Sequence, residues 1–558
     1  MTILLGFIVL FVAWLAPAHF NPWVNFHNEL CAAVGALLVG FGAVSAAGGS
    51  KTVVWTPLSL VVLAAAIVAA LQTLFGQIRF ISDGALAVAY LVGFAVAMST
   101  GATLVQSPRR AEFLSGLFAT LLAAGLVSVG IAAVQWLELT PMSLVEAIPR
   151  GGRPFANLVQ PNHLASLLAL ALVGALWLYE ERRIQGPVLA LCALWLGLGI
   201  VMTRSRFPWL FFFVFAFGWW GLRRRAGLRL SGKAVALSMV TFFALALAWG
   251  QISQAVDVAA PLSVAERLQG GGGRLQIWKA VAEGLWASPW VGYGWSQVSK
   301  AGLVGSLQHF TGEAMLRNSH STPLDLLVWN GILIGLLFVG AAVWWFVRQV
   351  RGCSSAQQFV LLAAVSVVLT HALFEFPLEY LYFMLTAGLL MGALDHWTLD
   401  ARVWRAPRLA LALPLVALTA TTAWVAVEYA RVQLASSDNL IVLAGYGERA
   451  ELPDVVLLDA PREYIRFWKT AAKPAMTAAE LAWMRDVAER NPAPPSLLRY
   501  ALAMGLNGRA NDASDTLVRL CNMHRAARCD EGRASWAQLT AQYPVLGSIA
   551  YPSTPTGQ

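Results

Sequence analysis

Two arginines of this chain lie where charge is costly, between long apolar runs. The segment "VMTRSRFPWL" separates two such runs by a very short turn that contains Arg204 and Arg206. A charged side chain at mid-membrane costs about 2.5–3.5 kcal/mol on insertion scales, so such residues mark a binding site or a pathway. Snorkelling to lipid headgroups is the alternative interpretation. Arg153, in "RGGRPFANLVQPNHLAS", has a similar position just before another run.

Histidine and amide side chains accompany these arginines. His320, in "RNSHSTPLDLLVWNG", directly precedes an apolar run. An imidazole in contact with water titrates near neutral pH, so it can take the proton of an attacking hydroxyl. The alternative is an interfacial histidine that caps the next helix together with Ser321 and Thr322. Three amide side chains lie near Arg153: Asn157, Gln160 and Asn162.

The arginines, the histidine and the amides together suit an anionic, phosphate-linked lipid as substrate. Arginine binds phosphate oxygens through a bidentate fork and needs no metal to do so. No G-x-S-x-G or H-E-x-x-H motif occurs, and the long loops contain no D-x-D pair for a divalent cation. We therefore expect no metal and no other cofactor.

One histidine and two glutamates follow each other at helical spacing and could suggest a metal site. These residues are His371, Glu375 and Glu379, and Pro377 interrupts the helix between the glutamates. Tetrahedral metal sites prefer more nitrogen or sulfur ligands than this set offers. The simpler interpretation is a polar helix end at the membrane surface.

The elements that position these residues are apolar helices. Of the 558 residues, 58% are hydrophobic and 12% are charged, against about 25% charged in soluble domains. This composition excludes an ordinary soluble enzyme, a disordered chain and a fibrous protein. Continuous runs of membrane-spanning length indicate an all-α polytopic membrane protein. Thirteen runs are expected, near 1–17, 30–47, 55–75, 84–105, 113–136, 163–179, 186–203, 207–221, 234–250, 326–347, 358–376, 380–396 and 409–429.

The charge of the loops alternates along the chain. Loops after even-numbered runs carry most of the basic residues, in clusters such as 109–110, 182–183 and 223–225. Because loops rich in Lys and Arg stay in the cytoplasm, the N-terminus is predicted inside and the C-terminal region outside. The net charge of +9 has the same origin, and we expect no nucleic-acid partner.

Three predicted outer regions are long enough to build a site: 137–162, 251–325 and the tail 430–558. We expect residues 1–429 to form a transmembrane catalytic domain whose site lies largely on the long periplasmic loop 251–325. Residues 430–558 are expected to form a separate helical periplasmic domain, because the tail gains charge and lacks long apolar runs.

Three amphipathic helices are expected in the tail, at 476–490, 495–507 and 511–526. The stretch "LLRYALAMGLNGRANDASDTLVRLCNMH" looks like one helical hairpin of a tetratricopeptide-type repeat, although such arrays need several repeats to bury their faces. Cys521 and Cys529 lie in this tail. Outside the membrane they could form a disulfide; two buried thiols are equally compatible with the sequence.

Four segments occur in the order found in the O-antigen ligase superfamily. They are "RPFANLVQPNHLASLLAL", "TRSRFPWL", "GRLQIWKAVAEGLWASPWVGYG" and "NSHSTPLDLLVWNGILIGLLF". The N-terminal "APAHFNPWVNFHNEL" and the long tail resemble the pilin-glycosylation branch, the bacterial O-linked protein oligosaccharyltransferases. The resemblance implies a helical bundle similar to glycosyltransferase class C, with an outer catalytic cavity.

The resemblance also implies a role for single residues. His320 matches the essential histidine of the outer loop, while Arg206 and Arg274 match arginines thought to hold the diphosphate of the donor. Trp278 matches the aromatic partner of Arg274. Arg153 is expected to assist in diphosphate binding. Two further residues are expected to support the site: Gln160 and Asn162. By contrast, Arg204 and His309 have no motif role and are expected to tolerate replacement.

The resemblance predicts a metal-independent, inverting transfer of a preassembled oligosaccharide. The donor is undecaprenyl-diphosphate-linked oligosaccharide, and the acceptors are Ser/Thr hydroxyls of periplasmic proteins such as pilin. The enzyme would lie in the bacterial inner membrane, among membrane lipid, with its site facing the periplasm. Two alternatives keep the chemistry: an O-antigen ligase acting on lipid A core, or an O-antigen polymerase. A third alternative is a transporter of lipid-linked sugar, although no convincing internal repeat is present.

Overall fold

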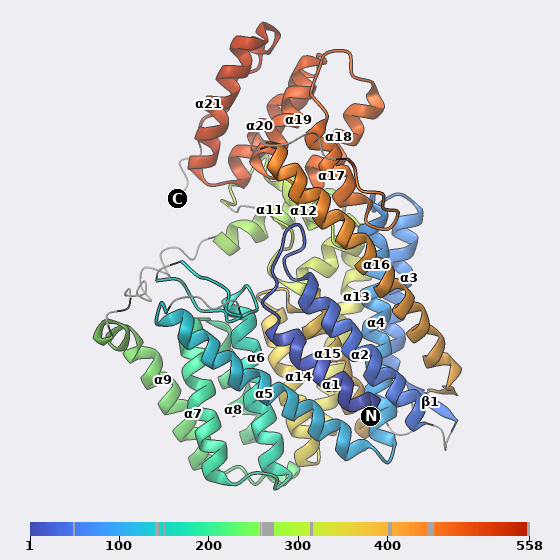
Figure 1. The fold of residues 1–558 in the computed structure, drawn as a ribbon, viewed down its shortest axis with the longest axis vertical. Helices are drawn as coiled ribbons and strands as arrows, with labels where there is room; N and C mark the ends of the chain where they lie inside the picture. The colour runs from blue at the N-terminus through green and yellow to red at the C-terminus, as the bar shows by residue number, and fades with distance from the viewer. Residues whose placement is uncertain are drawn as a thin grey trace. The chain divides into compact units, whose positions relative to one another are not determined.

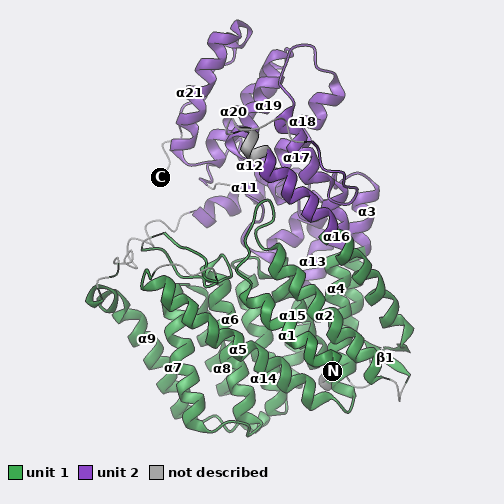
Figure 2. Ribbon diagram, in the orientation of Figure 1, with its two compact units in different colours: residues 1–66, 89–263, 341–426 green, residues 67–88, 264–340, 427–558 purple. Residues whose placement is uncertain are grey.

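The computed structural model is almost wholly helical (Figure 1), which confirms the predicted all-α polytopic class. Parts of the predicted regions 137–162, 251–325 and 430–558 lie outside the residues that it describes. The structure divides into two compact units (Figure 2). The described residues are 1–47, 51–139, 144–149, 151–256, 258, 273–312, 316–399, 404–443 and 451–554.

The first unit comprises residues 1–66, 89–263 and 341–426. Four of its boundaries fall within helices, namely α3, α4, α13 and α16. The elements that lie wholly or partly in this unit are α1 (Thr2–Leu15), α2 (Phe26–Ala46), β1 (Thr52–Trp55), α3 (Pro57–Leu74), α4 (Ile81–Gln106), α5 (Arg110–Trp136), α6 (Pro161–Glu180), α7 (Gly186–Thr203), α8 (Phe207–Ala226), α9 (Gly232–Ala255), α13 (Thr322–Gly352), α14 (Ala356–Ala372), the 3-10 turn η2 (Pro377–Glu379), α15 (Leu381–Leu399), β2 (Trp404–Pro407) and α16 (Leu409–Leu443).

Each of the thirteen predicted apolar runs coincides with a helix. Within the described residues, nine helices are long and apolar enough to cross a membrane: α2, α3, α4, α5, α6, α7, α9, α13 and α16. Three further helices, α1, α14 and α15, are apolar but shorter than these nine within the described residues. The remaining run lies on α8, which ends in three arginines, 223–225. The number of helices that actually span the membrane stays a prediction.

The core of the first unit centres on α6, which packs against α5, α7 and α14. Small residues allow this close packing, as is common between membrane helices. A Cβ at Gly174 would lie 2.6 Å from the carbonyl oxygen of Phe118, and one at Gly101 would lie 2.1 Å from that of Leu389. Larger residues at these glycines would therefore push the helices apart.

A short two-stranded sheet is the exception to the all-helical prediction. Strand β1 pairs antiparallel with β2, with Thr52 opposite Pro407 and Trp55 opposite Trp404. The two strands lie in the loops after the second and twelfth apolar runs. Because paired strands must lie on one face of the bundle, this pairing agrees with the predicted placement of both loops on the same side.

Side-chain contacts in the first unit sort the loops into the two predicted sets. Gln357 donates to Glu181 at 2.8 Å, which joins two loops predicted to be cytoplasmic. Asn157, in the predicted outer region 137–162, donates to the carbonyl oxygen of Leu15 at 2.8 Å, at the end of α1 that is predicted to face outside. Both contacts agree with the predicted alternation of the loops.

The second unit comprises residues 67–88, 264–340 and 427–558, so the tail groups with the loop that carries His320. The predicted domain boundary at 429–430 falls inside the continuous helix α16. Besides parts of α3, α4, α13 and α16, the unit contains α11 (Gly273–Ala287), α12 (Val298–Gly305), α17 (Asp459–Lys469), α18 (Ala478–Arg490), α19 (Pro494–Leu506), α20 (Ala510–Met523), α21 (Ala526–Gln542) and the 3-10 turn η3 (Pro544–Ser548).

Helix α13 is interrupted at Gly331, whose φ of 76° and ψ of 169° are not helical. The carbonyl oxygens freed by the interruption accept from the preceding loop. Val328 O accepts from Tyr293 N at 2.8 Å, and Trp329 O accepts from Gly294 N at 3.0 Å. A Cβ at Gly331 would lie 2.3 Å from a backbone oxygen, so this approach requires glycine.

The tail forms a helical layer with its own apolar core. The three predicted segments coincide with α18, α19 and α20, while α17 and α21 were not predicted. A disulfide between Cys521 and Cys529, with a Cα–Cα distance of 4.6 Å, joins α20 to α21. The structure therefore selects the disulfide from the two alternatives that the sequence left open. The tetratricopeptide-type architecture stays a prediction. The large buried core side chains include Phe467, Met484, Tyr500, Leu517 and Trp536.

Candidate active site

The predicted site residues are divided between the two units. The first unit contains four of them: Arg153, Gln160, Asn162 and Arg206. The second unit contains the remaining three: Arg274, Trp278 and His320.

Asn162 is the centre of a polar network in the first unit. Its Oδ1 accepts from Arg153 Nη2 at 3.0 Å and from Ser205 Oγ at 2.7 Å. Its Nδ2 donates to Glu375 Oε1 at 2.8 Å. Arg153 Nε also donates to the carbonyl oxygen of Thr203 at 2.8 Å. The predicted supporting residue Asn162 thus fixes the guanidinium of Arg153 between the ends of three helices.

Local sequence explains how these helix ends form. Pro161 occupies the first turn of α6, where its missing N–H costs nothing, and Gln160 is the N-cap in extended conformation. Helix α7 ends at Arg204 in the left-handed conformation, and α8 begins directly at Phe207. Among the described residues, no hydrogen bond joins the side chain of Gln160 to the Asn162 network.

The two arginines of the turn between α7 and α8 differ in their surroundings. Arg206 is the N-cap of α8 and is exposed. Arg204 is half-buried and donates to the carbonyl oxygen of Gly151 at 3.0 Å. Arg204 therefore holds the loop before α6, so its replacement would loosen that loop. Because of this contact, we expect the replacement of Arg204 to affect the protein, although the sequence suggested that it would be tolerated.

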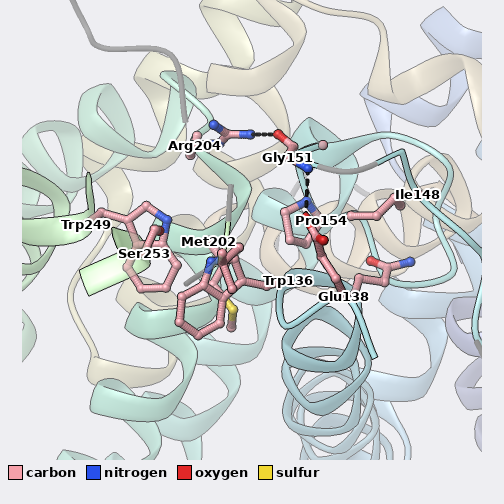
Figure 3. A pocket seen from close by; sticks show the side chains of 12 residues that line it. Trp136, Glu138, Ile148, Gly151, Pro154, Met202, Arg204, Trp249 and Ser253 are labelled. Atoms are coloured by element: carbon pink, nitrogen blue, oxygen red, sulfur yellow. Dashed lines mark hydrogen bonds between the residues drawn. The ribbon is translucent and has the colours of Figure 1, made fainter. Parts of the chain in front are cut away.

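A small pocket of about 10 Å³, room for about one water molecule, lies beside Arg204 (Figure 3). The peptide of Gly151 is held from both sides, since its N–H donates to Glu138 Oε1 at 3.1 Å and its oxygen accepts from Arg204. Trp136 and Trp249 line the same pocket, with ring centroids 4.7 Å apart. None of the predicted site residues lines this pocket.

His371 and Glu375 contact protein groups in the first unit. Ser166 Oγ lies 2.7 Å from His371 Nδ1, and Asn162 donates to Glu375. Among the described residues, no group of three or more His, Cys, Asp or Glu side chains is arranged to hold a metal ion. Glu375 instead belongs to the network that orients Arg153, a role that the sequence did not reveal.

In the second unit, His320 lies directly before α13 and is half-buried, with a φ of 56°. The neighbouring Ser319 is held on both sides of its backbone. Its N–H donates to Asp325 Oδ1 at 2.8 Å, and its oxygen accepts from Trp278 Nε1 at 2.9 Å. Arg274 lies on α11 one turn before Trp278. Trp278 thus positions the backbone next to His320.

The tail contacts the segment that leads to His320 within the same unit. Thr311 N donates to Asn522 O at 2.8 Å, and Asn522 Nδ2 donates to Ser306 O at 2.7 Å. Arg317 Nη2 donates to Asn491 Oδ1 at 3.3 Å. The tail helices therefore help to shape the loop, and the sequence did not predict these contacts.

Charged side chains join the tail to the start of α4. Arg490 donates through Nε and Nη2 to Asp83 at 2.8 and 2.7 Å, which is a bidentate pair. Nearby, burial lowers the pKa of Lys300, and the carboxylates of Glu489 and Asp486 oppose that effect. Burial likewise raises the pKa of Glu489. These groups lie in the contact between α12 and α18.

Comparisons with known families cover most of the chain. Residues 188–340 match the family described as O-Antigen ligase. Residues 154–179 match Protein glycosylation ligase, and residues 359–543 match Virulence factor membrane-bound polymerase, C-terminal. The predicted resemblance is confirmed. The first match contains Arg206, Arg274 and His320, and the second contains Asn162.

Two curated proteins of Acinetobacter baylyi are similar to this chain. A general O-oligosaccharyltransferase is 28% identical over 535 residues, which are 94% of this chain and 92% of that protein. A ComP-specific O-oligosaccharyltransferase is 27% identical over 274 residues, 48% of each chain. These names denote a glycosyltransferase activity, so the predicted enzyme class is confirmed at that level. The similarity also supports a multi-pass membrane protein of the O-antigen ligase kind.

Proposed function

We propose that this chain is an O-linked protein oligosaccharyltransferase of the bacterial inner membrane. It moves a preassembled oligosaccharide from undecaprenyl diphosphate to Ser/Thr hydroxyls of periplasmic proteins, pilin among them. The observation that carries the proposal is the similarity to the general O-oligosaccharyltransferase, which extends over 94% of this chain and includes the tail. The Cys521–Cys529 disulfide supports a tail outside the cytoplasm, because disulfides persist in oxidising compartments.

The proposed mechanism needs two kinds of side chain. The acceptor hydroxyl attacks the anomeric carbon from the face opposite the diphosphate, the bond from that carbon to the phosphate oxygen breaks, and the configuration inverts. Arg206 and Arg274, assisted by Arg153, stabilise the charge that grows on the leaving diphosphate, which is often the largest catalytic contribution. His320 takes the hydroxyl proton, a contribution of about 10²–10⁴-fold.

A reconstitution with purified protein tests the proposed function. Lipid-linked oligosaccharide is mixed with a Ser/Thr-containing acceptor protein or with lipid A core, and the products are identified by mass spectrometry. We expect the intact oligosaccharide on a serine or threonine of the protein. Transfer to lipid A core alone would replace the proposal with the second candidate, an O-antigen ligase.

The second candidate is favoured by the family matches to O-Antigen ligase and to a membrane-bound polymerase. An O-antigen polymerase would lengthen the lipid-linked glycan without any protein acceptor. The same mass spectra distinguish this outcome, because the product would then be a longer glycan on the lipid carrier.

Metal removal provides a separate prediction. Because arginines are proposed to neutralise the diphosphate, transfer is expected to keep its rate in excess EDTA. The control is the same preparation with added Mg²⁺ or Mn²⁺, which should not raise the rate. If chelation stops transfer and a divalent cation restores it, the arginine-only mechanism is wrong.

A further inference from the structure

Asp325, in the first turn of α13, is a buried carboxylate that needs an explanation. Its side chain is 1% exposed. Its Oδ1 accepts from Ser319 N at 2.8 Å, but its Oδ2 has no hydrogen-bond partner among the described residues. Leaving a buried polar atom unpaired costs free energy, and leaving a charged group unpaired costs more. A simple helix cap would need only the first oxygen.

Asp325 closes a short ring of hydrogen bonds around His320. Its own N–H donates to the carbonyl oxygen of Ser321 at 2.9 Å, and that oxygen also accepts from Ser319 Oγ at 3.1 Å. His320 lies within this ring with a positive φ of 56°. Non-glycine residues in such conformations cost free energy and persist only when their surroundings hold them.

The charge of Asp325 also acts on the imidazole. His320 and Asp325 interact electrostatically, and the carboxylate lies on the helix that directly follows the histidine. In histidine bases, a buried carboxylate commonly fixes the orientation of the ring and stabilises the imidazolium that forms when it accepts a proton. The charge of Asp325 is only partly used by its hydrogen bond to Ser319 N, because Oδ2 has no hydrogen-bond partner among the described residues.

We propose that Asp325 is the positioning residue of His320, holding the adjacent backbone through Oδ1 and stabilising the imidazolium that forms during transfer through the charge of its carboxylate. This inference rests on the general-base role proposed above for His320. Asp325 itself touches neither donor nor acceptor. Its replacement should therefore lower kcat and leave the KM for the lipid-linked donor unchanged.

Two conservative variants separate a charge role from a packing role. D325N keeps the shape and an acceptor oxygen for Ser319 N, but it removes the charge. D325E keeps the charge on a longer stem. We expect D325N to lose about 10²-fold in kcat, the lower end of what a base contributes, and D325E to retain more activity than D325N. A purely structural role predicts the opposite order, because asparagine fits the site better.

A matched control is D459N in the same unit. Asp459 accepts from Ile81 N and Ser82 N at 3.0 and 2.8 Å at the start of α4. D459N should keep near-normal kcat. This result would show that the loss of a capping carboxylate in this unit is not by itself enough to lower kcat. Melting temperature, measured on each purified variant, should stay close to the parent value for D325N.

The possible outcomes are distinguishable. Near-normal kcat in D325N, or a D325N that exceeds D325E, overturns this inference and leaves the role of His320 intact if H320A is inactive. A D325N variant that does not fold also overturns the inference. The charge of Asp325 would then be needed to stabilise the fold and not to position His320. If H320A is active, the general-base proposal itself fails.

Discussion

His320→Ala is expected to abolish oligosaccharide transfer while the protein still accumulates in the membrane. The imidazole is half-buried in a turn before α13, so its removal should disturb packing little. Its proposed role as base predicts a loss of about 10²–10⁴-fold. The measurement is the initial rate of transfer to an acceptor protein at matched enzyme concentration.

His309→Ala is the matched control for this prediction. His309 is the same residue type in the same unit, is also half-buried, and has no recorded side-chain hydrogen bond among the described residues. Its variant should keep near-normal transfer. If the His320 variant is equally active, His320 is a helix cap and the proposed base lies elsewhere.

Arg490→Met is expected to destabilise the second unit and to reduce transfer. The variant leaves the Asp83 carboxylate, whose side chain is 11% exposed, without its bidentate partner. Breaking a fully buried pair costs about 3–5 kcal/mol. Because the Arg490 side chain is 28% exposed, we expect roughly 2 kcal/mol here after allowance for solvent screening. Melting temperature and limited proteolysis of purified protein measure the effect.

The double variant Asp83→Asn, Arg490→Met is the control for that prediction. Removing both charges leaves no buried unpaired carboxylate, so stability should recover in part. A tail that only recruits acceptor protein predicts a different result. In that case Arg490→Met would weaken transfer to proteins but leave the melting temperature unchanged, and the contact between the tail and the start of α4 would not stabilise the unit.

Hydropathy alone located the thirteen apolar helices, because spanning length is a local property of the sequence. Each of the thirteen apolar runs coincides with a helix, and the helices at 478–490 and 494–506 of the tail lie within two residues of their predicted starts. Loop charge likewise sorted the loops into two sets that the contacts of Asn157 and Gln357 agree with. The strands β1 and β2 escaped prediction, since each becomes a strand only by pairing with the other.

For the candidate site, the sequence singled out residue types that are costly beside a membrane. Asp325 carried the same signal, an acidic residue one position before the apolar run 326–347, and was overlooked. Glu375 was considered as a metal ligand or as part of a polar helix end, whereas it accepts from Asn162 and so helps to orient Arg153. Such partners could not be predicted, because Asn162 and Glu375 are 213 positions apart.

The sequence by itself determined the class of protein and the order of its apolar helices, and it singled out the histidine and arginines proposed for the site. Only the tertiary structure decided which groups hold these residues in place. The tail joins the unit that carries His320 because Arg490 pairs with Asp83, 407 positions away, and Thr311 donates to Asn522. Hydropathy and motif spacing act over tens of residues, whereas a buried polar group must be satisfied by whatever the fold brings beside it.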